Sequence, residues 1–168
     1  TNGIFQMTMN TTLAGALALS LLSATAFAQS PSLPDADFVM KAGVGNTFEI
    51  EEAKLALEKA ADPKVKDFAN MMLTDHQDAL KTLQATEPGK SAKMMLDAPH
   101  QAMLDNLKGF SGADFDKIYK ADQVASHAET EALLADYQQN GQNADLKGWV
   151  NDVLPKVKHH RAMINAMP

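Results

Sequence analysis

The chain of 168 residues contains no cysteine. This absence excludes a thiol nucleophile, a cysteine-ligated zinc site, an iron–sulfur cluster and a lipid anchor attached through cysteine. Basic residues are also few, since 15 Lys and Arg stand against 21 Asp and Glu and give a net charge of −6. An acidic chain without a basic cluster binds nucleic acid and anionic membrane surfaces poorly. We therefore expect neither as a partner.

The first 34 residues contain no charged side chain. Residues 13–22 form an apolar run of the length found in signal peptides, and Ala26-Phe27-Ala28 matches the usual cleavage pattern. We predict a leader over residues 1–28, cleaved near Ala28, even though no Lys or Arg precedes the apolar run; the alternative is a buried N-terminal helix. The run is short for a membrane-spanning helix, so no stable membrane insertion is expected after processing. Export of this kind predicts a periplasmic or secreted protein.

The rest of the chain predicts a short linker over 29–34 and a single domain over 35–168. Apolar residues recur there at spacings of three and four, without the alternation typical of strands, which indicates an all-α fold. Long helices are expected at 35–61, 63–86, 112–140 and 143–167, with a short helix between 97 and 109. The connection over 87–111 is too long for a tight turn and can run the length of a bundle. This predicts a ferritin-like four-helix bundle with a helix-containing crossover.

Each long helix places a metal-competent side chain on its apolar stripe: Glu49, His76, His127 with Asp122 and Gln123 one turn earlier, and His160. Burying a carboxylate and several imidazoles costs several kcal/mol unless they pair or bind a cation. The five His, Asp and Glu residues among these are therefore the candidate metal ligands. The other acidic residues of the 49–52 stretch are expected to be mainly solvated helix surface.

The height of each candidate along the bundle can be counted from the turns. Glu49 lies 13 positions before residue 62 and His76 lies 14 after it, so both are about 20 Å from the turn and are expected to face each other. His127 lies 14 positions before residue 141 and His160 lies 19 after it, a mismatch of about 8 Å. Asp122 or Gln123, which lie 19 and 18 positions before residue 141, would match the height of His160 better.

Oxygen and nitrogen ligands suit zinc, manganese, iron or copper(II), and are a poor choice for copper(I). A diiron bundle would need Glu three residues before two of its histidines. Leu73, Val124 and Val157 occupy those positions here, so oxidase chemistry is not favoured. No triad order, phosphate loop or dinucleotide fingerprint is present either. The sequence therefore favours binding over catalysis and predicts no catalytic residue.

Several motifs spread over the four long helices are similar to one known family. They are Phe48-Glu49-Ile50-Glu51, residues 54–59 and 62–69, Asp75-His76, residues 111–116, Asp122-Gln123 with His127, and Leu154-Pro155 with His160. Together they resemble the family called domain of unknown function 4142. The resemblance implies an exported bacterial four-helix protein of ferritin-like fold, with recurring polar positions at the candidate ligands, and it implies no activity. Glu52 departs from the family, which usually has an apolar residue there.

Two functions follow from these residues. The first is an exported bundle that binds a transition metal through the buried His and carboxylate groups for storage, buffering or structural stability. The alternative is a non-enzymatic envelope or stress-response binding protein, in which the same groups form a hydrogen-bonded network without metal. Neither a particular protein partner nor an oligomeric state is predicted.

Overall fold

The computed structural model describes residues 33–168, and the predicted leader and its cleavage site lie outside this range. The described chain forms five α-helices: α1 (Asp35–Lys59), α2 (Pro63–Ala85), α3 (Ala98–Lys108), α4 (Gly112–Asn140) and α5 (Ala144–Ala166). A short 3₁₀ helix, η1 (Gly89–Ser91), precedes α3, and no strand occurs in this range. The predicted helix bounds agree with the observed ones to within two residues. None of the described helices is long and apolar enough to cross a membrane.

Side-chain caps explain where three of these helices begin. Asp62, Asp97 and Asn143 each accept a hydrogen bond from a backbone N–H in the first turn of the helix that follows. Pro63 stands at the first position of α2, where its missing N–H costs nothing. Ser111 occupies the predicted capping position of α4 but makes no side-chain cap hydrogen bond.

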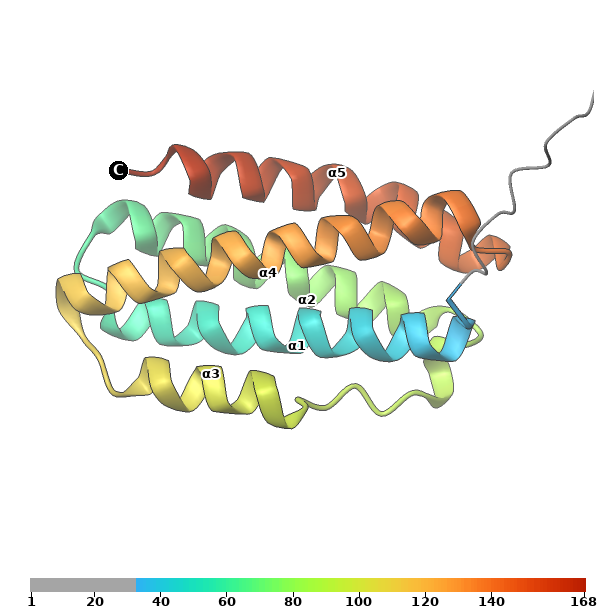
Figure 1. Ribbon diagram of the computed structural model, residues 1–168, viewed down its shortest axis with the longest axis horizontal. Helices are drawn as coiled ribbons and strands as arrows, with labels where there is room; N and C mark the ends of the chain where they lie inside the picture. Colours follow the sequence, from blue (N-terminus) through green and yellow to red (C-terminus); the bar gives the residue numbers. More distant parts are fainter. Residues whose placement is uncertain (1–32) are drawn as a thin grey trace, which may run out of the picture.

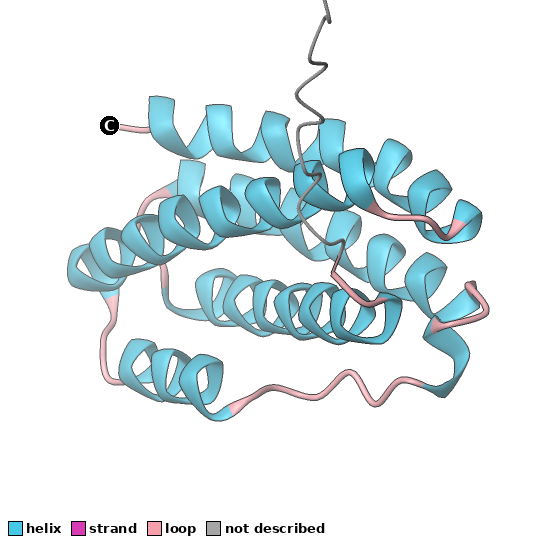
Figure 2. Ribbon diagram, turned by 45° about the vertical axis from the view of Figure 1, so that its right-hand side comes forward, coloured by secondary structure: helices cyan, strands magenta, loops and turns pink. Residues whose placement is uncertain are grey.

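The four long helices form a bundle in which contacting neighbours follow the order α1, α2, α5, α4. Helices α1 and α2 form one antiparallel hairpin, and α4 and α5 form the other (Figure 1). The connection that carries η1 and α3 runs back along the bundle beside α1, so α4 starts where α1 ends (Figures 1 and 2). Helix α4 therefore runs parallel to α2, which confirms the ferritin-like topology.

Hydrogen bonds and close packing fix this crossover at both ends. At one end Asp116 of α4 accepts hydrogen bonds from the backbone N–H groups of Ala61 (3.1 Å) and Asp62 (2.9 Å). At the other, the side chain of Met94 packs on α1 where Gly43 leaves room, because a Cβ at Gly43 would lie 2.4 Å from Met94 Cγ. The second hairpin is thereby set in register with the first.

The interior contains two apolar clusters separated by a polar layer. One cluster, which includes Phe38, Leu83, Tyr137 and Trp149, lies where α1 and α5 begin and α2 and α4 end. The other lies at the opposite end of the bundle and includes Phe68. The polar residues buried between them are Asn46, Glu49, Glu52, His76, Gln123, His127 and His160. A polar layer in the middle of a bundle costs free energy unless its groups are satisfied.

Candidate metal centre

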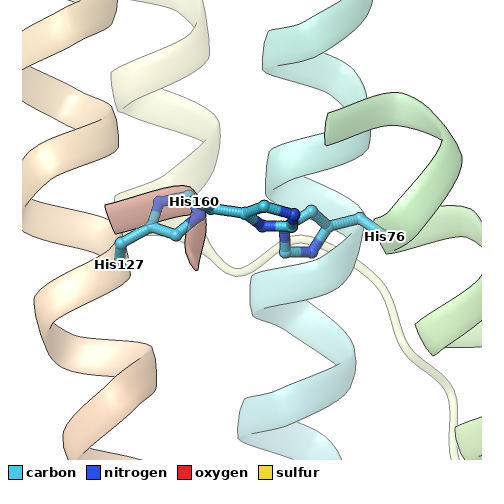
Figure 3. A group of neighbouring side chains, drawn as sticks. All are labelled: His76, His127 and His160. Carbon is cyan, nitrogen blue, oxygen red and sulfur yellow. The ribbon is translucent and has the colours of Figure 1, made fainter. Parts of the chain in front are cut away.

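Three histidines from three different helices meet in the polar layer. His76 of α2, His127 of α4 and His160 of α5 each offer a ring nitrogen, and these nitrogens lie within 4.8 Å of one another (Figure 3). All three residues are at most 4 % exposed. The ring centroids are 5.5–5.9 Å apart. The three imidazoles are therefore the part of the candidate ligand set that the fold brings together.

A hydrogen bond fixes the orientation of His76. Its Nδ1 lies 2.9 Å from Asn46 Oδ1 on α1. The amide of Asn46 is held in this orientation because its Nδ2 donates to the carbonyl of Ala42, at 2.8 Å. Since Asn46 Oδ1 can only accept, the proton of the neutral imidazole belongs on His76 Nδ1, which leaves a lone pair on Nε2.

The other two rings are held in the same way. His127 Nδ1 lies 2.8 Å from the backbone carbonyl of Gln123, and His160 Nε2 lies 2.8 Å from Asp75 Oδ2. Both partners are acceptors, so each of these nitrogens carries the proton. The lone pairs then lie on His127 Nε2 and His160 Nδ1.

The three nitrogens that bear lone pairs are buried without a hydrogen-bond partner among the described residues. A buried polar atom left in this state costs about 1–3 kcal/mol. Neutral imidazole nitrogens are also common ligands of transition metals, at bond lengths of about 2.0–2.1 Å. Such bonds place ligand nitrogens roughly 3.5 Å apart, and the three rings already offer nitrogens within 4.8 Å of one another. The residues present therefore fit a bound cation.

Burial keeps two of these rings in the form that binds metals. Burial, followed by the neighbouring imidazoles of His127 and His160, lowers the pKa of His76 well below its usual value. Burial also lowers the pKa of His160, although its hydrogen bond to Asp75 acts in the opposite direction. Both rings are consequently neutral near pH 7, as a metal ligand must be.

Asp75 connects the site to the surface. Its carboxylate contacts His160 and also accepts a hydrogen bond from Lys156 Nζ, at 2.8 Å. Burial raises the pKa of Asp75, but the hydrogen bonds from Lys156 and His160 outweigh this effect and leave the pKa below its usual value. A charged carboxylate behind an imidazole orients the ring and makes it a stronger ligand.

A small cavity and a surface groove lie near His76. A small cavity of about 20 Å³ borders Asn46 and His76, which is room for one water molecule. A surface groove of about 510 Å³ shares four of its walls with this cavity: Lys41, Gly45, Thr130 and Leu133. The groove and the cavity therefore adjoin each other along these four residues.

Glu49 lies in the polar layer but faces α4 and not His76. Its carboxylate accepts hydrogen bonds from Gln123 and Ser126, and one oxygen lies 3.7 Å from His127 Nδ1. The partner of His76 on α1 is Asn46, three residues before Glu49, which sequence reasoning missed. The spacing could have revealed this position, because Asn46 lies four residues after Ala42 and so continues the apolar stripe of the helix.

Asp122 and Glu52 lie outside the cluster of the three histidines. Asp122 is half-buried; burial raises its pKa, the charge of Glu49 adds to the rise, and an interaction with Glu52 opposes it. Glu52 corrects the expectation of a solvated acidic face, because its side chain is fully buried against Gln123, at 2.8 Å. The triad thus takes His127, and not Asp122, from α4.

The mismatch in height between His127 and His160 disappears for two reasons. Residues 141–143 form the turn, so His127 lies 13 positions before the end of α4 and His160 lies 16 after the start of α5, which reduces the difference to about 4.5 Å. Helical side chains also lean toward their own N-terminus. In this antiparallel pair, His127 therefore leans away from the turn and His160 leans toward it.

Comparison with known proteins identifies the family of the chain. Residues 21–167 match the family described as a domain of unknown function (DUF4142), and the chain belongs to this family. No curated protein matches the chain.

Two solved structures share the fold. The structure described as "CopM in the Cu(I)-bound form" superposes with a TM-score of 0.67 and 17 % identity, covering 80 % of this chain and 94 % of CopM. "CopM in the Cu(II)-bound form" gives a TM-score of 0.64 and 18 % identity, covering 80 % and 95 %. At this identity the similarity establishes the helical fold.

Proposed function

We propose that this member of the DUF4142 family binds one transition-metal ion through His76 Nε2, His127 Nε2 and His160 Nδ1, for storage or buffering. The observation that carries the proposal is the convergence of three buried lone pairs, each on a ring whose other nitrogen is already hydrogen-bonded. Each bond is the kind of outer contact that orients histidine ligands in metal proteins. The small cavity beside His76 offers space for a water molecule near the ion.

Copper is the first candidate for the ion, with zinc second. Three imidazoles and no thiolate suit copper(II) and zinc. The similarity in fold to CopM, which has been observed in Cu(I)-bound and Cu(II)-bound forms, supports copper. The triad itself is neutral, so the charge of the ion would be balanced by Asp75 behind His160 and by Glu49, 3.7 Å from His127.

A metal-free hydrogen-bonded network is the alternative, and the pattern of donors opposes it. In such a network each buried nitrogen that accepts a hydrogen bond needs a donor, and each that donates needs an acceptor. Here the three inward nitrogens are all acceptors, and the described residues supply no donor to any of them. A cation satisfies all three at once, whereas protonation of one ring would place an imidazolium in a site where burial disfavours charge.

Metal titration of untagged protein, followed by thermal melting, tests this function. We expect one copper(II) or zinc ion per chain, and replacement of His160 by Ala should weaken binding at least 100-fold. The matched control is His159→Ala, because His159 is the exposed neighbour on the same helix. Metal should raise the melting temperature of the wild type and of the control, since a ligand held only by the folded state stabilises it. Equal binding by the His159 and His160 variants would refute the proposal.

A further inference from the structure

A second group of buried polar residues lies between α1 and α4, beside the triad. Glu49 and Glu52 are one turn apart on α1 and are 2 % and 0 % exposed. The side-chain amide of Gln123, fully buried on α4, donates through Nε2 to both carboxylates. No Lys or Arg forms an ion pair with either carboxylate in the described part of the chain. Two adjacent buried acids are therefore left without a compensating cation.

Three oxygen atoms of this group have no hydrogen-bond partner within residues 33–168: Glu52 Oε1, Gln123 Oε1 and the hydroxyl of Tyr119. Burial, together with the charge of Glu49, raises the pKa of Glu52 to about 10. Burial and then the charges of Glu49 and Glu52 raise the pKa of Tyr119 well above its usual value. Without a cation Glu52 therefore holds a proton, and the half-buried carboxylate of Asp122 on α4 interacts with it.

We propose that Glu49, Glu52 and Gln123 form a second cation site, specific for a hard divalent ion such as Mn²⁺. The ligands would be the two carboxylates, with the amide oxygen of Gln123 as a neutral donor. Oxygen ligands of this kind suit manganese and magnesium, whereas imidazoles suit copper and zinc, so the two sites select different ions. On binding, the ion replaces the proton of Glu52, which leaves to solvent.

Gln123 can adapt this group of residues both to the absence and to the presence of a bound ion. Its Nε2 now donates to Glu49 and Glu52, as suits a pair of carboxyl groups without an ion. A half-turn of the amide exchanges Nε2 for Oε1, and an oxygen then faces the position between the carboxylates. The same side chain thus serves as a donor when the site is empty and as a ligand when it is filled.

The proposed manganese site does not depend on the function proposed for the triad. Its ligands come from α1 and α4, and those of the triad come from α2, α4 and α5. The two groups are adjacent, since Glu49 Oε1 lies 3.7 Å from His127 Nδ1. They share no ligand, so each can be removed by substitution while the other is measured.

The test is titration with Mn²⁺ alone, following free Mn²⁺ by electron paramagnetic resonance. We expect the wild type to bind one Mn²⁺ and Glu52→Gln to bind it at least 10-fold more weakly. Gln has the shape of a protonated Glu, so this variant is expected to fold. The matched control is Glu51→Gln, because Glu51 is the adjacent acid and its side chain is 42 % exposed.

The His160→Ala variant separates the two proposals. It should retain the Mn²⁺ site while losing the copper or zinc site. Mn²⁺ binding that survives in Glu52→Gln, or a folded wild type that binds no Mn²⁺, would overturn the second site and leave the triad untouched. Loss of copper and zinc binding with the Mn²⁺ site intact would overturn only the triad.

Discussion

Replacing Glu52 with Gln should change how the stability of the metal-free protein depends on pH. Burial and the charge of Glu49 raise the pKa of Glu52 to about 10, whereas an unfolded chain has a value near 4.5. Between these limits the folded state holds a proton that the unfolded state does not. The free energy of unfolding therefore falls as pH rises, by about 1.4 kcal/mol per pH unit from this group alone. Gln carries no such proton, so the variant lacks this slope.

The size of the effect follows from the distance between pH 7 and the pKa of the unfolded chain. At 1.36 kcal/mol per pH unit, the contribution of Glu52 to the free energy of unfolding of the wild type is about 3 kcal/mol smaller at pH 7 than at pH 4.5. Because Gln keeps the contact of Glu52 with Gln123, the variant should be more stable than the wild type at pH 7 by an amount of this order. Most substitutions at a fully buried position destabilise, so the sign alone is informative.

Urea unfolding in chelator at pH 6 and pH 8 measures this difference. The wild type should lose about 2.7 kcal/mol relative to Glu52→Gln between the two pH values. Glu51→Gln, at the exposed neighbouring position, should follow the wild type. Parallel pH profiles for the wild type and Glu52→Gln would show that Glu52 is ionised in the folded protein, and would refute the account of its burial.

Three further predictions concern the triad. Asp75→Asn should weaken copper or zinc binding by about 10- to 100-fold in a competition titration, because the charge behind His160 is lost. The control Asp78→Asn, at an exposed position one turn along the same helix, should leave the affinity unchanged. Equal affinities of the two variants would refute the role of Asp75. Burial lowers the pKa values of His76 and His160, so the unfolded state takes up protons first. In the Glu52→Gln variant, which lacks the opposing effect of Glu52, the melting temperature of the metal-free protein should therefore fall as pH drops below about 6.5; a melting temperature that rises there would contradict this. We expect metal to enter through the groove that adjoins the cavity beside His76, so Gly45→Leu should slow metal association in stopped-flow measurements with little change in equilibrium affinity. An unchanged rate would place the entry elsewhere.

The helices could be predicted closely because their signals are local. Asp62-Pro63 and Asp97 mark helix starts by capping chemistry, and the spacing of apolar residues fixes the helical period. The crossover could also be predicted, because a connection as long as residues 87–111 can span the bundle. The structure agrees with the sequence on all of these features.

The partners within the polar layer could not be predicted from sequence. Counting residues to a turn gives the height of a side chain but not the rotation of its helix, so the count pairs Glu49 with His76 although Asn46 faces that ring. The count also ignored the lean of side chains along antiparallel helices, which brings His127 to the height of His160. The burial of Glu52 depends on Gln123 across the interface, a contact that no local pattern encodes.

The measurement that tests the central claim most directly is anomalous diffraction from crystals of the protein loaded with copper or zinc. The account predicts one strong anomalous peak about 2.0 Å from each of His76 Nε2, His127 Nε2 and His160 Nδ1. A loaded crystal with its only peak at the exposed His159, or with no peak between the three buried rings, would contradict it.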